Sequence, residues 1–271
     1  MKPARKLGVA ILVALTPLWV GCHQIREAKS RQLTRSALEA FFSQDYDKAL
    51  EHSEVALRLG SDQPDLRRMR ASIFLTRGEP ESALKEVDEG LALFESQKRR
   101  AKGANGGETT KSDKEGELSE ADRSQFLVMR SNALQALDRP EESLTALNDA
   151  VKLDPENAGA QNNLAWLLAT STVDKMRDAK LAIEHARKAC ELTNWKEAGT
   201  IDTLAAAYAE SGNYKEAERW QREAIAKAAP DEKSDPGFEE RRTLYEQGKP
   251  YREDPNATYQ ARLKTENPEA N

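Results

Sequence analysis

The sequence predicts an all-α protein, a right-handed solenoid of about five helical hairpins closed by one further helix. Composition is the first indication: 32% of the 271 residues are charged and 6% are aromatic, a profile that favours helices with long exposed faces over a thick sheet core. The second is a register of about 34 residues, the length of one helical hairpin unit, in which small residues recur. The third is the turn residue within a unit, such as Gly212.

The N-terminus resembles a bacterial lipoprotein signal. A basic start is followed by an apolar stretch over residues 7–20, which is shorter than the roughly 20 residues that span a bilayer and fits a signal peptide. The stretch ends in Val20-Gly21-Cys22, with Trp19 where the lipobox usually has Leu. The resemblance implies that residues 1–22 are the signal peptide and that Cys22 carries lipid. Ordinary secretory cleavage and an uncleaved anchor are the alternatives.

Five hairpin units follow, at about 30–63, 64–97 and 124–157 and from residues 158 and 198. The best of them reads AGTIDTLAAAYAESGNYKEAERWQREAIAKAAP from Ala198, with small residues at Ala205 and Ala217. Two antiparallel helices approach closely only where side chains are small, so this order resembles the tetratricopeptide repeat (TPR). The fourth unit has extra residues within 170–176. The resemblance places repeats one and two at 30–97 and repeats three to five at 119–231.

A charged insertion separates repeats two and three. Residues 98–118 are rich in Lys, Glu, Gly and Ser, so we expect them to be disordered. Two repeats alone are marginal, which favours one solenoid with a looped-out insertion; two separate domains are the alternative. Ser119 followed by Asp122 predicts an N-cap that restarts the helix.

After the fifth repeat, residues 235–248 are predicted to form a capping helix. Pro236 suits the first helical position and Gly248 the end of the helix. Such a helix would cover the last repeat and give the end of the stack the polar outer surface that a terminal cap provides. The polar tail, residues 249–271, is expected to fray.

Several function classes are disfavoured by the sequence. The net charge of −5 argues against a nucleic-acid partner, which usually leaves a basic footprint. The three histidines are far apart in sequence, and no group with metal-ligand spacing or nucleophile motif stands out. We therefore expect no enzyme activity and no cofactor. Cys190 is expected to be a buried thiol without a disulfide partner.

The resemblance implies a concave groove lined by the first helix of each repeat. Its predicted lining residues are Arg68, Gln125, Val128, Asn132, Gln135, Asn162, Asn163, Trp166 and Asp202. Trp166 either anchors a ligand chain or packs against the next repeat. Asn132 and Asn163 fall at the asparagine places of a known carboxylate clamp, but the basic places hold uncharged residues, Val128 among them. Capture of a chain-terminal carboxylate would then lack its charge-assisted bonds and is not expected.

These patterns predict a membrane-anchored scaffold that binds an unknown protein or extended peptide in its groove. The lipobox resemblance implies the bacterial cell envelope, with the protein anchored through an N-terminal lipid and facing the periplasm or exterior. The alternative function is a self-associating structural component of an envelope assembly. The sequence leaves the oligomeric state open.

Overall fold

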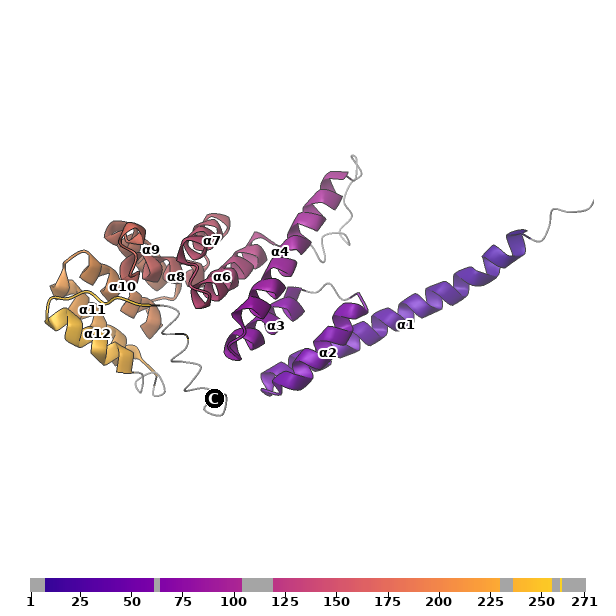
Figure 1. The fold of residues 1–271 in the computed structure, drawn as a ribbon, viewed down its shortest axis with the longest axis horizontal. Coiled ribbons are helices and arrows are strands. Elements are labelled where there is room, and N and C mark those ends of the chain that lie inside the picture. Colours follow the sequence, from indigo (N-terminus) through magenta and orange to yellow (C-terminus); the bar gives the residue numbers. More distant parts are fainter. Residues whose placement is uncertain (1–7, 61–63, 104–118, 230–235, 255–258, 260–271) are drawn as a thin grey trace, which may run out of the picture. The chain divides into compact units, whose positions relative to one another are not determined.

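The computed structural model describes residues 8–60, 64–103, 119–229, 236–254 and 259 (Figure 1). In the first helix, side chains are described from Gln24 onward, so the predicted lipidation site Cys22 lies outside the described side chains. Among the described residues, no helix combines the length and the apolarity needed to cross a membrane. Every named element in this part of the chain is helical.

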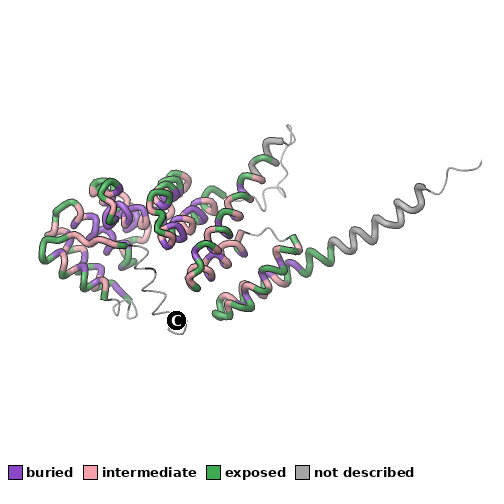
Figure 2. The backbone as a smooth tube through the Cα atoms, in the orientation of Figure 1, coloured by how far each residue is buried: buried purple, intermediate pink, exposed green. Residues whose placement is uncertain are grey.

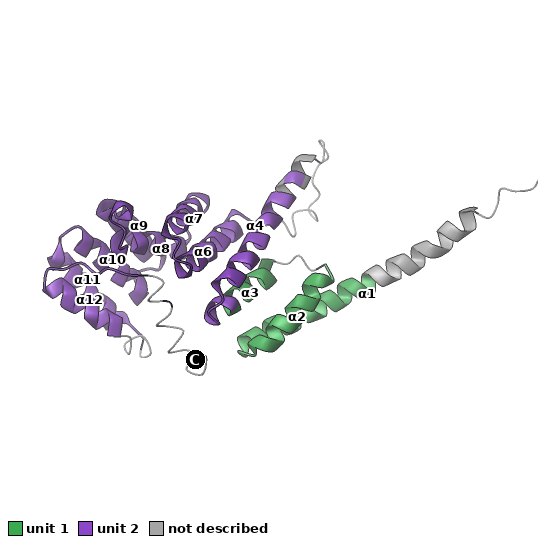
Figure 3. Cartoon of the chain, in the orientation of Figure 1, with its two compact units in different colours: residues 1–73 green, residues 74–271 purple. Residues whose placement is uncertain are grey.

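The chain divides into two compact units, residues 1–73 and 74–271 (Figure 3). The boundary lies within one helix, α3 (Pro64–Thr76), and not in the charged insertion. The sequence did not predict a division there.

The first unit is built on a hairpin of α1 (Gly8–Phe42) and α2 (Tyr46–Arg58), which pack against each other. The Asp45 carboxylate accepts a hydrogen bond from the Lys48 backbone N–H at 3.2 Å and caps α2. The core of this unit combines alanines of the two helices with larger apolar residues of α3. Its fully buried members include Ala37, Ala49, Ala56, Leu66 and Ile73.

The second unit holds α4 (Pro80–Gly103) and three complete hairpins. These are α6 (Glu120–Ala136) with α7 (Pro140–Leu153), α8 (Ala158–Thr170) with α9 (Ala179–Leu192), and α10 (Ala198–Glu210) with α11 (Tyr214–Lys227). A last helix, α12 (Pro236–Glu246), packs on α11 and contacts α10. The extra residues of the fourth unit form a short 3-10 turn, η1 (Asp174–Met176).

Several helices begin where the sequence supplies a side-chain cap. Ser119 accepts a bond from the Asp122 backbone N–H while the Asp122 carboxylate accepts one from the Ser119 N–H, which is a complete capping box. The predicted restart of the helix at Ser119 is thus confirmed. Asn157, Asp178 and Asn213 cap α8, α9 and α11, each with one side-chain oxygen that accepts a single backbone N–H bond.

The insertion is shorter than predicted because α4 continues to Gly103. Residues 98–103, expected to be disordered, are helical, and residues 104–118 lie outside the described part. α4 packs directly against α6 on the other side of the insertion. The rings of Phe94 and Phe126 meet edge to face at 6.0 Å, and a Cβ on Gly90 would lie 2.3 Å from the Phe126 ring. The hairpin stack therefore continues from α4 to α6.

A continuous apolar core runs through the second unit from α7 to α12. Buried residues line the faces that the helices turn to one another (Figure 2). Ala205 and Ala217 are both fully buried, as close packing of α10 on α11 requires. Cys190 is also fully buried, as predicted, and its thiol donates to the Thr200 carbonyl. Burial raises the pKa of this thiol to about 11, so it is unreactive at neutral pH.

Candidate functional site

The first helices α6, α8 and α10 lie next to one another in the second unit, and we call the surface they form the first-helix face. Predicted groove residues are accessible on α6 and α8. Gln125 and Asn132 are exposed, whereas Val128, Gln135, Asn162, Asn163 and Trp166 are half-buried. The structure brings two of them together: the Asn163 Nδ2 donates to the Asn132 Oδ1 at 3.3 Å. This part of the face is a carboxamide surface.

Two predicted groove residues behave differently. Arg68 lies on α3, in the first unit, where it pairs with Asp65 on its own helix. Asp202 is only 5% exposed, so its prediction as an open groove residue is wrong. Its Oδ1 accepts from Arg241 Nε at 2.8 Å and from Gln221 Nε2 at 2.7 Å. The reason is tertiary, because α12 brings Arg241 over this position.

The Arg241–Asp202 pair is buried on both sides. Burial alone lowers the pKa of Arg241, but the charge and hydrogen bond of Asp202 outweigh it and the pKa lies above its ordinary value. The guanidinium therefore stays charged. Beside it, Tyr245 is fully buried against alanines of α10 and α11. α12 thus closes the α10 end of the first-helix face.

Beyond α12 the chain continues in an extended form, residues 250–254, which we call the C-terminal segment. The expectation that the chain frays after residue 248 is wrong for these residues. The backbone N–H of Glu253 donates to the Thr170 carbonyl at 2.9 Å, and Glu253 forms an isolated parallel bridge with Ser171. The segment therefore lies along the end of α8.

Trp166 contacts two residues of the C-terminal segment. Its indole N–H donates to the Glu253 carboxylate, and its ring lies 5.9 Å from the Tyr251 ring. The guanidinium of Arg241 lies 5.4 Å from the Trp166 ring and 5.5 Å from the Tyr251 ring, within the range of cation–π attraction. Trp166 also packs on the core of the hairpins. It thus contacts both the core and a chain segment that the sequence did not place there.

A charged cluster holds the middle of the C-terminal segment. Arg252 pairs with Glu210 at the end of α10 and donates to the Ala169 carbonyl at 3.3 Å. Glu210 also accepts from Arg177 at 2.9 Å. Hydrogen bonds to Asp174 and Glu210 raise the pKa of Arg177 above its ordinary value, against the effect of burial. Arg177 stays charged, and Glu210 is shared between Arg177 and Arg252.

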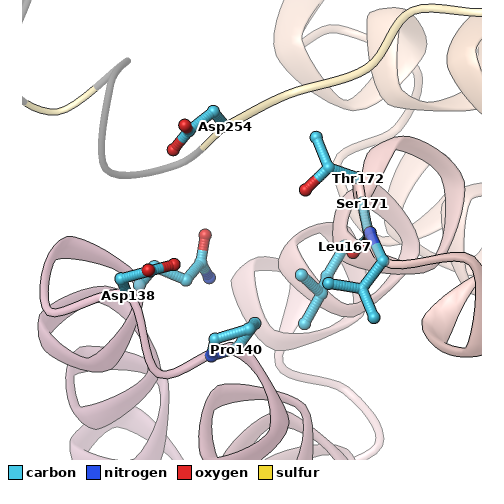
Figure 4. A pocket seen from close by; sticks show the side chains of 8 residues that line it. Asp138, Pro140, Leu167, Ser171, Thr172 and Asp254 are labelled. Carbon is cyan, nitrogen blue, oxygen red and sulfur yellow. Dashed lines mark hydrogen bonds between the residues drawn. The ribbon is translucent and has the colours of Figure 1, made fainter.

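A cavity of about 80 Å³ lies beside the end of the segment (Figure 4). It is lined by Gln135, Asp138, Pro140, Leu167, Ser171, Thr172, Val173 and Asp254. Asp254 lies across the opening from Asp138 and Pro140. The space suits a few water molecules or a small side chain, not a cofactor. Farther along, the Tyr259 hydroxyl donates to the Leu75 carbonyl at 2.7 Å.

The described residues contain no group of three or more His, Cys, Asp or Glu side chains that could hold a metal ion. Sequence reasoning missed Arg241, Tyr251, Arg252 and Glu253, which build the surroundings of Trp166. One signal in the sequence could have indicated this: Tyr251 is an aromatic residue in a polar tail. Burial of an aromatic ring is favourable, so such a residue is expected to pack against the rest of the protein.

A family model described as the tetratricopeptide repeat matches residues 34–98 and 128–194. These two ranges carry tetratricopeptide repeats. The tetratricopeptide resemblance inferred from the residues is confirmed there, and the structure confirms the all-α solenoid of TPR hairpins. The α10–α11 hairpin, whose sequence resembles the repeat most closely of the five units, lies outside the matched ranges.

Solved structures share this TPR fold. PilF of Pseudomonas aeruginosa is 18% identical, with 90% of this chain and 95% of that chain covered and a TM-score of 0.56. PilW, described as a widely conserved type IV pilus biogenesis factor, is 17% identical, with 89% and 94% covered and a TM-score of 0.57. MamA is 15% identical, with 76% and 96% covered and a TM-score of 0.52. A comparison with curated proteins finds no match.

Proposed function

We propose that this TPR protein is a membrane-anchored scaffold that binds a protein or an extended peptide on its first-helix face. The observation that carries the proposal is the carboxamide surface of α6 and α8. Gln125 and Asn132 are exposed there, and Asn163 lies within hydrogen-bond distance of Asn132. A carboxamide both donates and accepts, so it pairs with a peptide backbone running in either direction.

The face has further properties of a binding surface. It is built on helices whose packing fixes the side chains, which limits the ordering cost of binding. It is adjoined by Trp166, a large aromatic of the kind that dominates binding energy at interfaces. The charged groups beside it include Arg177, Glu210 and Arg241, which are paired with one another or with neighbouring carboxylates.

The binding proposal is tested by capture of partners on the immobilised protein. We expect Asn132→Ala/Asn163→Ala to lose the partners that the unchanged chain retains, because the amide pair is removed from the face. The matched control is Asn148→Ala, which removes an exposed carboxamide from the second helix α7, where it donates only to the Leu144 carbonyl. Equal capture by both variants would contradict binding on the first-helix face.

Membrane anchoring is the second part of the proposal and is supported by the sequence at Gly21-Cys22. Cys22→Ser is expected to release the protein from membranes or to leave an unprocessed precursor. Stable retention needs two or more acyl chains, because one chain anchors only marginally. Membrane fractionation and the intact mass of the mature protein measure this. A variant with the partition and mass of the unchanged protein would refute the lipoprotein proposal and leave partner binding untouched.

A further inference from the structure

The C-terminal segment has the features of a bound peptide. It is the thin yellow stretch that follows α12 in Figure 1, and it is extended. Its side chains are half-buried at Tyr251, Arg252 and Glu253, and Asp254 is exposed. It is held at successive residues by contacts to α8, α10 and α12, in the way that a groove holds a linear ligand.

The first two positions of the segment meet different residues of α8, α10 and α12. The aromatic ring of Tyr251 lies near Trp166 and the Arg241 guanidinium. The positive charge of Arg252 is paired with Glu210. The first position favours an aromatic residue, which packs near the Trp166 ring and the Arg241 guanidinium. The second favours a basic residue, because an acidic residue opposite Glu210 would be repelled.

The third position combines side-chain and backbone recognition. The Glu253 carboxylate accepts from the Trp166 indole N–H, while the Glu253 backbone N–H donates to the Thr170 carbonyl. Thr170 is the last residue of α8, and the last carbonyls of a helix have no partner within the helix. Any ligand that displaces the segment must bring an equivalent backbone donor and an acceptor for the indole.

The observations define a sequence preference. Building on the proposed function, we propose that the site formed by Trp166, Arg241, Glu210 and the Thr170 carbonyl binds an extended aromatic–basic–acidic segment of a partner protein. In the unbound protein the chain's own Tyr251-Arg252-Glu253 occupies this site. The partner competes with the C-terminal segment, which acts as an internal ligand.

The internal ligand sets how tightly a partner binds. A tethered segment has an effective concentration on the order of millimolar for a short connection, and the C-terminal segment follows α12 directly. A free peptide must compete with that concentration. Weakening the segment's own contacts should therefore raise the apparent affinity of the site for a free peptide.

The test uses the full chain and a fluorescent peptide with the sequence of residues 249–259, KPYREDPNATY. Tyr251→Ala/Glu253→Gln in the full chain weakens the internal ligand without changing the site. We expect this variant to bind the peptide at least tenfold more tightly than the unchanged chain does, measured by fluorescence anisotropy. The control peptide carries the same two substitutions and is expected to bind neither protein.

Three outcomes would overturn the inference. The first is equal peptide binding by the two proteins, and the second is no binding by a variant whose circular dichroism spectrum is unchanged. The third is a dimer of the unchanged chain that the variant cannot form, because the segment would then occupy the site of a second copy. If partner capture still depends on Asn132 and Asn163, only this inference fails. If that dependence is absent while the peptide binds, only the proposed function fails.

Discussion

The helix α12 and the C-terminal segment that follows it both cover the first-helix face, but they are held in different ways. α12 places Tyr245 in the core, fully buried, and pairs Arg241 with Asp202 below 10% residue exposure. The C-terminal segment offers only half-buried side chains and an exposed Asp254. The difference indicates that α12 is an integral part of the solenoid and that the segment is an exchangeable cover.

The physical reason lies in how each region satisfies its backbone. α12 makes its own backbone hydrogen bonds and needs the solenoid for the burial of its side chains. The extended segment makes no such bonds and relies on carbonyls at the end of α8, as Glu253 does with Thr170. A competing peptide supplies the same donors, so the segment can be exchanged without leaving these carbonyls unpaired.

The largest effect in this comparison is expected for α12. Asp202→Ala leaves the buried Arg241 guanidinium without its carboxylate. Breaking a buried ion pair in this way typically lowers the free energy of unfolding by about 3–5 kcal/mol. Denaturant unfolding followed by circular dichroism measures the loss. A change below about 1 kcal/mol, the range of exposed ion pairs, would show that Asp202 is a surface residue after all.

The control for this variant removes both charges. Asp202→Leu/Arg241→Met is expected to recover most of the lost stability, because replacing a buried ion pair with apolar side chains is often neutral. Gln221 keeps a partner in the double variant, since its Nε2 also donates to the Phe238 carbonyl at 3.1 Å. A double variant as unstable as the single one would mean that packing, and not charge, holds α12.

A much smaller effect is expected for the C-terminal segment. Tyr251→Ala/Glu253→Gln removes half-buried contacts and should lower the free energy of unfolding by about 1 kcal/mol or less. The same denaturant measurement applies. A loss comparable to that of Asp202→Ala would place the segment in the core with α12 and remove the distinction between the two regions.

Much of the repeat architecture was predictable because its signals are local. The hairpins α8–α9 and α10–α11 begin at Ala158 and Ala198, as the repeat register predicts. Ser119 caps α6 through bonds to a residue three positions away. The end of α4 was misplaced because residues 98–103 are charged but remain compatible with a helix, as Lys and Arg are good helix formers.

The candidate site was only partly predictable. Trp166 was predicted either to anchor a ligand or to pack against the next repeat, but its partner Glu253 is 87 residues away in sequence. Asp202 was assigned to an open groove because repeat register alone places it there, while its partner Arg241 is 39 residues away. Neither pairing produces a periodic pattern in the sequence, so sequence periodicity could not predict it.

The sequence by itself determined the helices, their pairing into TPR hairpins and the close packing at Ala205 and Ala217, because periodicity, caps and side-chain size act over one or two helical turns. Only the tertiary structure decided that Asp202 is buried and that Tyr251 and Glu253 occupy the surroundings of Trp166. Those contacts depend on where the chain travels after its last repeat. That path is set by the burial of α12 on the end of the solenoid, a packing energy that no local pattern encodes.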